Sequence, residues 1–286
     1  MNARKSNECK YECLLFDMDD TLYPMSSGIN LACRMNIEEY MLRYLKMEES
    51  QVPRMCLELY KEYGTTMAGL KALGYEFDND QFHAYVHGRL PYDNLKPDPT
   101  LKNLLLSMPQ RRIIFTNADK AHSTQVLKRL GLEDCFQGII CFETLNSSLE
   151  RNEIYKNMNK KLPLSENYAD DPDRGTEFAH CNQSGCHSRI LCKPSLKAIE
   201  AAIQIANADP MKTIFFDDSA RNIASAKIAG LRTVVVGSTV LVPGADLALG
   251  SIHNMKEALP EIWEGEDQET QGQVLRSKAV ETTVLA

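Results

Sequence analysis

Residues 14–21 read LLFDMDDT, an apolar run that ends abruptly in three carboxylates and a threonine. We expect the apolar residues to end a strand that is buried on both faces of a parallel sheet. Ligands of open α/β sheets bind beyond the carboxyl ends of the strands, so Asp17 and Asp19 would project into a site. Two carboxylates this close repel each other unless a cation or a shared proton relieves them. A simple polar turn is the alternative, because Asp is common in turns.

The composition is that of a soluble protein with a substantial core. The chain has 286 residues, of which 43% are hydrophobic and 25% are charged. The formal net charge of −7 argues against nucleic acid as a partner. No apolar run approaches the roughly 20 residues of a membrane helix, so we expect no membrane partner. Nine scattered cysteines and a polar N-terminus predict reduced thiols in the cytoplasm, with the nucleus as a second possible compartment.

A block of helices without strand signal follows the first strand. Its apolar residues recur at helical spacing, and glycines separate the shorter stretches. The expected helices cover residues 29–45, 52–63, 66–73 and 80–87. We interpret residues 25–93 as a small helical cap that interrupts a core formed by residues 1–24 and 94–260.

Strands and helices alternate in the rest of the chain, which implies parallel pairing with right-handed crossovers. The fold class is therefore α/β, a Rossmann-like parallel sheet with a small α-helical cap inserted after the first strand. Periodicity is lost over residues 143–188, interpreted as a surface insertion, and beyond 265, interpreted as a disordered tail over 265–286. The expected strands cover 11–16, 112–115, 138–141, 213–216 and 232–236, and the expected helices 100–107, 120–130, 195–206, 220–229 and 255–263.

Polar residues follow several of these apolar runs directly. Because carboxyl ends of parallel strands share one edge of the sheet, we expect their side chains to meet there. Each residue alone has a simpler explanation, as a turn, a helix cap or a surface lysine. Their recurrence at successive strand ends favours one common site. Besides Asp17 and Asp19, the residues concerned are Thr116, Asn117, Lys193, Asp217 and Asp218.

These residues resemble the four motifs of the haloacid dehalogenase (HAD) superfamily, in its phosphatase branch. The motifs match DMDDT at 17–21, TN at 116–117, Lys193 and DDSARN at 217–222, in the family's order. The words DMDDTLYP and FFDDSARNI resemble more closely the pyrimidine 5′-nucleotidase-like proteins of plants and fungi. The resemblance covers residues 11–237, and the helical block matches the position of the family's cap.

The resemblance implies a phosphomonoesterase that forms an aspartyl phosphate. It implies Asp17 as the nucleophile and Asp19 as the acid that protonates the leaving group and then activates water. Haloacid dehalogenases proper lack an acid at this second position, so Asp19 favours phosphate esters over carbon–halogen bonds. Lys193 would hold nucleophile and phosphate together, and Thr116 and Asn117 would hydrogen-bond the phosphoryl oxygens.

The resemblance also implies Mg²⁺ as the cofactor. Hard oxygen ligands, with room left for water and phosphate, suit this ion. Asp17, the backbone carbonyl of Asp19 and Asp218 would bind the metal. Asp217 and Asn222 would contact the residues that bind the metal, or reach the metal through water.

A small phosphorylated metabolite is the expected substrate, and a nucleoside 5′-monophosphate is indicated by the resemblance alone. Arg89 and Tyr92, near the cap hinges, are candidate substrate contacts, as is Tyr23. Alternative substrates are a sugar phosphate or flavin mononucleotide. A different class of function is a catalytically idle HAD-fold interaction protein, against which the complete set of acids argues. The sequence does not indicate an oligomeric state.

Two further groups of metal-binding residue types stand outside the motifs. His180-Cys181 and Cys186-His187 resemble half of a zinc site, although their spacing is not that of a common zinc finger. His83 and His87 lie four residues apart on an expected helix and so share a face. Lining the cleft, packing and solvent contact all remain open for this pair.

Overall fold

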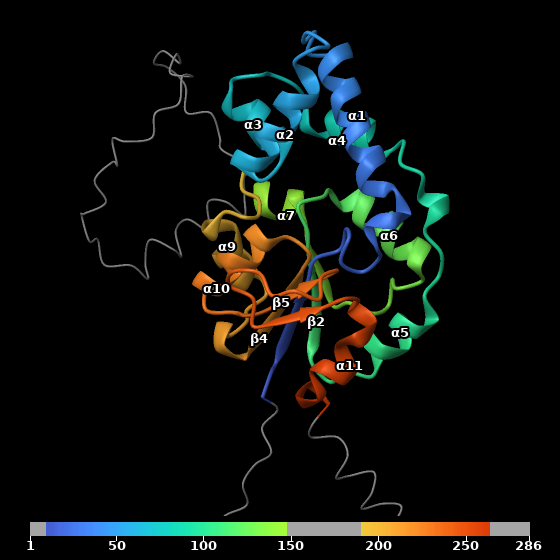
Figure 1. Ribbon diagram of the computed structural model, residues 1–286, viewed down its shortest axis with the longest axis vertical. Helices are drawn as coiled ribbons and strands as arrows, with labels where there is room; N and C mark the ends of the chain where they lie inside the picture. The colour runs from blue at the N-terminus through green and yellow to red at the C-terminus, as the bar shows by residue number, and fades with distance from the viewer. Residues whose placement is uncertain (1–9, 148–189, 264–286) are drawn as a thin grey trace, which may run out of the picture.

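The computed structural model describes residues 10–147 and 190–263, whose core is a six-stranded parallel sheet (Figure 1). The strand order is β3-β2-β1-β4-β5-β6, which places β1 near the centre. The chain adds β2 and β3 on one side of β1 before it crosses to β4 on the other, so the order reverses at β1. The strands are β1 (Cys13–Phe16), β2 (Arg111–Phe115), β3 (Gly138–Ile140), β4 (Thr213–Asp217), β5 (Arg232–Val236) and β6 (Leu247–Leu249).

Helices cover both faces of the sheet, which explains why its central strands are apolar throughout. Leu14 and Phe16 of β1 pack toward α5 (Pro99–Leu106), α6 (Lys120–Leu130) and α11 (Met255–Ala258). Cys13 and Leu15 pack toward α9 (Leu196–Ile205) and α10 (Ala220–Ile228). All four residues of β1 are completely buried, so the strand that carries the acidic stretch is fixed on both faces.

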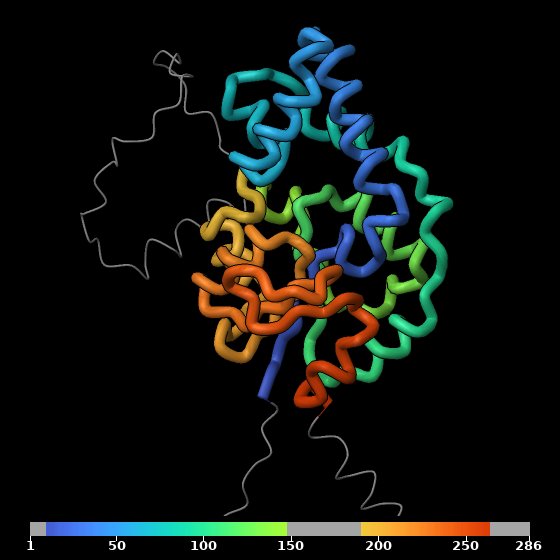
Figure 2. The backbone as a smooth tube through the Cα atoms, in the orientation of Figure 1, coloured from blue at the N-terminus to red at the C-terminus, as the bar shows by residue number. Residues whose placement is uncertain are grey.

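Four helices between β1 and β2 form a layer at the carboxyl ends of the strands, at the top of Figures 1 and 2. They are α1 (Ile29–Arg43), α2 (Val52–Tyr63), α3 (Thr66–Ala72) and α4 (Asn79–His87), and we call them the cap helices. Their apolar cluster is separate from the two clusters beside the sheet. Phe142 of α7 (Phe142–Asn146) joins this cluster and so ties the cap helices to the core. The 3₁₀ turns are Met25–Ser27, Tyr92–Asn94, Pro210–Lys212, Ile252–Asn254 and Pro260–Ile262.

The predicted fold class is confirmed, and most expected elements begin and end within two residues of the observed ones. Three elements differ from the expectation. β6 was not expected, because it lacks the β-branched residues of the equally short β3. α7 occupies the start of the predicted insertion. The helix expected over 255–263 ends at Ala258, because Pro260 cannot continue it. The rest of the insertion, the predicted tail and the zinc candidates His180, Cys181, Cys186 and His187 lie outside the described residues.

None of the helices in the described ranges combines the length and apolar character needed to cross a bilayer.

Candidate active site

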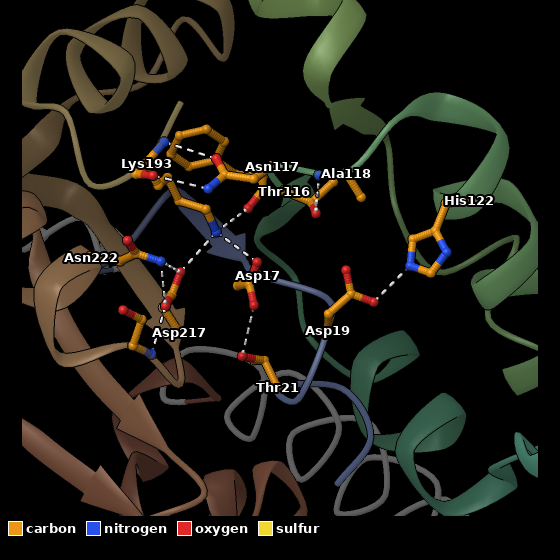
Figure 3. Close-up of polar contacts among 12 residues, drawn as sticks. Asp17, Asp19, Thr21, Thr116, Asn117, Ala118, His122, Lys193, Asp217 and Asn222 are labelled. Atoms are coloured by element: carbon orange, nitrogen blue, oxygen red, sulfur yellow. Dashed lines mark hydrogen bonds and ion pairs between the residues drawn. The ribbon is translucent and has the colours of Figure 1, made fainter. Parts of the chain in front are cut away.

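Lys193 joins the ends of three neighbouring strands (Figure 3). Its Nζ donates to Asp17 Oδ1 at 2.6 Å, to Asp217 Oδ2 at 2.8 Å and to the carbonyl of Phe115 at 2.8 Å. An ammonium has three protons, so these acceptors use all of them. Burial favours loss of the proton, but the carboxylates of Asp17 and Asp217 raise the pKa of Lys193 and keep it charged. The side chain is 1% exposed, so the ion pairs are screened little by water.

Three carboxylates gather around this single ammonium. Oxygens of Asp17, Asp217 and Asp218 lie within 4.8 Å of one another. Burial, opposed by Lys193 and reinforced by Asp217 and Asp19, raises the pKa of Asp17 to about 7. Burial and the negative charge of Asp17 raise the pKa of Asp218 to about 8. The cluster therefore carries more negative charge than Lys193 can balance.

A divalent cation fits this deficit of positive charge. Asp217 Oδ1 already accepts from the backbone N–H of Ser219 at 2.8 Å and from Asn222 Nδ2 at 2.9 Å. Asp17 and Asp218 have more freedom to bind a metal, and carboxylate oxygens are the ligands that Mg²⁺ prefers. Asn222 supports the cluster through Asp217, the position expected from the sequence.

Asn117 fixes the backbone of Lys193, a role that the sequence did not predict. Its Oδ1 accepts from the backbone N–H of Lys193 at 2.8 Å, and its Nδ2 donates to the carbonyl of Lys193 at 2.9 Å. The amide therefore fixes the loop that carries the lysine (Figure 3), and the second proton of Nδ2 is left for the predicted contact with a phosphoryl oxygen. Thr116 is buried, and its Oγ1 accepts from Ala118 N at 3.1 Å, which leaves the hydroxyl proton to donate to a ligand.

Asp19 is held apart from the carboxylate cluster by two hydrogen bonds that the sequence did not predict. Tyr23 donates its hydroxyl proton to Oδ1, and His122 Nε2 lies 2.8 Å from the same oxygen. Burial alone would raise the pKa of Asp19, but His122 and Tyr23 together lower it. His122 lies in the first turn of α6, shortly after the strand end at Thr116-Asn117. Its position near that predicted edge of the sheet is the sequence feature that could have indicated a role in the site.

A cavity of about 480 Å³ lies between the cap helices and the core. Asp19, Asn117 and Asp218 are among the residues that line it. Most of its wall is apolar, but His83, His87 and His122 line one part of it. The ring centroids of His83 and His87 are 5.5 Å apart, and those of His87 and His122 are 4.6 Å apart. The face shared by His83 and His87 thus lines the cleft.

Arg89 and Tyr92, predicted as substrate contacts, are not among the residues that line this cavity. Arg89 donates to Glu39 of α1 at 2.7 Å and its side chain is 47% exposed, because it lies beyond the end of α4. Tyr92 hydrogen-bonds His122 Nδ1 at 2.7 Å and so reaches the site only through that histidine. Neither side chain therefore contacts the cavity directly in this structure.

The sheet order and the helices inserted after β1 are those of a haloacid dehalogenase (HAD) type α/β fold. CbbY from Rhodobacter sphaeroides, solved in complex with phosphate, aligns with a TM-score of 0.52 at 15% identity, covering 86% of this chain and 96% of that one. L-2-haloacid dehalogenase from Xanthobacter autotrophicus aligns with a TM-score of 0.47 at 15% identity, covering 90% and 99%.

The chain is also similar in sequence to the yeast protein named Phosphate metabolism protein 8, from Saccharomyces cerevisiae. The two are 25% identical over 229 residues, which cover 77% of this chain. The match spans 60% of the yeast relative's length. No protein-family model matches the chain.

Proposed function

We propose that this protein is a Mg²⁺-dependent phosphomonoesterase that forms an aspartyl phosphate on Asp17. The observation that carries the proposal is the contact of Lys193 Nζ with both Asp17 and Asp217, inside a cluster of three carboxylates. The cluster lies where the strand order reverses, the position at which open α/β sheets bind ligands. Such a concentration of buried negative charge has no structural use and favours catalysis over a purely interacting protein.

The reaction divides into two transfers. In the first, a carboxylate oxygen of Asp17 bonds to phosphorus, the bond to the leaving oxygen breaks, and Asp19 donates a proton to that oxygen. In the second, Asp19 takes a proton from water, the water oxygen bonds to phosphorus, and Asp17 is released. The negative charge of a bound phosphate opposes the lowering of the Asp19 pKa by His122 and Tyr23. Asp19 therefore takes up its proton when the substrate binds.

Lys193 and the Thr116 hydroxyl stabilise the charge of the transferring group. Mg²⁺ held by Asp17 and Asp218, with the backbone carbonyl of Asp19, would neutralise part of the phosphoryl charge.

The cavity supports a small metabolite with apolar or aromatic surface. Its volume of about 480 Å³ is in the range typical of small-molecule sites. A sugar would leave many hydroxyls without partners against the mostly apolar wall. A nucleoside presents a flat ring that packs on aliphatic and aromatic side chains such as Tyr60 and Phe142. We therefore propose a nucleoside 5′-monophosphate, and the name of the yeast relative, which refers to phosphate metabolism, agrees with a phosphate ester.

Phosphate release from a substrate panel tests this function. The panel contains nucleoside 5′-monophosphates, sugar phosphates, flavin mononucleotide and p-nitrophenyl phosphate, each with Mg²⁺ or with EDTA. We expect Mg²⁺-dependent release, highest for a nucleotide. A folded protein that hydrolyses none of these esters would instead be an idle interaction protein.

The Asn117 side chain provides a prediction with a matched control. Asn117→Ala should lower kcat by about 10- to 100-fold, because Lys193 loses the amide that fixes its backbone and small misplacements are costly. Asn146 makes the same pair of hydrogen bonds to the backbone of Leu191, two residues earlier. Asn146→Ala should therefore lose similar stability in urea unfolding and much less activity. Equal losses of activity in both variants would show that Asn117 has no particular role at Lys193.

The raised pKa values predict how stability depends on pH. Asp17 and Asp218 have pKa values of about 7 and about 8 in the fold, against an ordinary value of 3.8. Between these limits the folded state binds more protons than the unfolded state, so the free energy of unfolding contributed by this pair falls as pH rises. Bound Mg²⁺ should take the place of the protons on Asp17 and Asp218, and so reduce this loss of stability at high pH. Thermal melts at about pH 5 and pH 8 should show a larger Mg²⁺-induced rise in Tm at pH 8, and a rise independent of pH would contradict the assignment.

A further inference from the structure

The carboxylate of Asp19 is held at one of its two oxygens. The Tyr23 hydroxyl and the His122 ring both contact Oδ1 (Figure 3 shows the contact with His122). In the described part of the chain, no hydrogen bond to Oδ2 is found, and Asp19 lines the cavity. One oxygen is thus anchored, and the other is left for proton exchange with a bound molecule.

His122 is itself fixed from both sides. Its side chain is 2% exposed, and its Nδ1 lies 2.7 Å from the hydroxyl of Tyr92. A carboxylate can only accept, so Nε2 of His122 carries the proton that is donated to Asp19. In the neutral ring, Nδ1 then accepts from the Tyr92 hydroxyl. In the charged ring, towards which Asp19 raises the pKa of His122, Nδ1 donates to the Tyr92 oxygen instead. In both states Tyr92 holds His122, and His122 holds Asp19.

We propose that His122 is the positioning residue for the acid–base group Asp19, and that Tyr92 orients His122. The inference rests on the proposed function. With Oδ1 held by His122 and Tyr23, Oδ2 gives its proton to the leaving oxygen, which keeps the electron pair of the broken P–O bond. In the second transfer, Oδ2 takes one proton from the attacking water, and inorganic phosphate and free Asp17 are formed.

This role predicts a dependence on the leaving group. An alkoxide leaves slowly unless it is protonated, whereas p-nitrophenolate is stable enough to leave unaided. General acid catalysis typically contributes about 10²- to 10⁴-fold. A variant that misplaces Asp19 should therefore lose far more activity on an ester of a primary alcohol than on p-nitrophenyl phosphate.

The experiment compares kcat/KM for the best primary-alcohol ester of the panel and for p-nitrophenyl phosphate. This constant covers the steps up to departure of the leaving group and excludes hydrolysis of the intermediate. We expect His122→Leu to lower the ratio of alkyl to aryl kcat/KM by about 10- to 100-fold, a part of the general-acid contribution. His122→Gln, which keeps an N–H donor, should recover part of it, and Tyr92→Phe should lower it less.

Ser123→Ala is the matched control. Ser123 is the neighbouring buried residue on α6, and its Oγ donates to the carbonyl of Asp119 at 2.8 Å. Its loss should leave the ratio unchanged. Equal losses on both esters in His122→Leu, or an unchanged ratio in a folded Tyr92→Phe, would overturn the positioning role while the proposed function stands. A parent protein that hydrolyses neither ester would overturn the proposed function, and the inference with it.

Discussion

Asp17→Asn should lower the rate of phosphate ester hydrolysis by at least about 10⁴-fold, because an amide cannot act as the nucleophile. The substitution keeps the size of the side chain in a buried position beside Lys193. It removes one ion-pair partner of the lysine, but it also removes a buried charge from a crowded cluster. These effects oppose each other, so we expect the variant to fold and to melt close to the parent. Steady-state kinetics with the panel substrates measure the loss of activity, and thermal melts measure the stability of the variant.

Asp20→Asn is the control for this substitution. Asp20 is also buried and accepts a hydrogen bond from Asn30 at 2.6 Å, but it lies outside the cluster of three carboxylates. Its backbone φ of +60° is one that Asn tolerates well. The control should keep most of the activity. If Asp17→Asn kept more than a few per cent of the parent rate, another group would have to be the nucleophile.

Removal of divalent metal should abolish turnover, the second large effect. Without a divalent cation, one lysine faces three carboxylates, and a phosphate dianion would enter a site that is already negative. EDTA should therefore inactivate the protein, and Mg²⁺ in excess should restore activity. Ca²⁺ should substitute poorly, because it favours more ligands and longer bonds.

Asp218→Ala should reproduce the effect of metal removal in part. We expect weaker Mg²⁺ binding, seen as a higher Mg²⁺ concentration for half-maximal activity. Asp93→Ala, which removes an exposed carboxylate that pairs with Arg129, should leave this concentration unchanged. Full turnover in EDTA would exclude the metal from the reaction.

The sheet and its polar edge could be predicted from local pattern. The run at 14–16 is apolar throughout because β1 is covered on both faces, and the carboxyl ends of parallel strands must meet. Asp17, Lys193 and Asp217 accordingly meet in the structure, although Asp17 and Asp217 are 200 residues apart in the sequence. β6 was not predicted because its residues, Leu-Ala-Leu, include no β-branched side chain, whereas the equally short β3 contains two isoleucines.

Side-chain partners could not be predicted, because they depend on how loops pack. The amide of Asn117 meets the backbone of Lys193, 76 residues away, and nothing in the spacing of either residue indicates it. His122 and Asp19 are 103 residues apart and meet only because α6 begins beside the end of β1. Arg89 was expected at the cleft, but it pairs with the half-buried carboxylate of Glu39 on α1.

The most direct test of the central claim is to trap the intermediate. The protein is mixed with Mg²⁺ and a substrate, quenched in acid within the first turnover, digested and examined by mass spectrometry. We expect a phosphoryl group on the peptide that contains Asp17, and none on that peptide in Asp17→Asn. Phosphate release by the parent with no phosphorylated Asp17, or with the phosphoryl group on a different residue, would contradict the aspartyl phosphate mechanism.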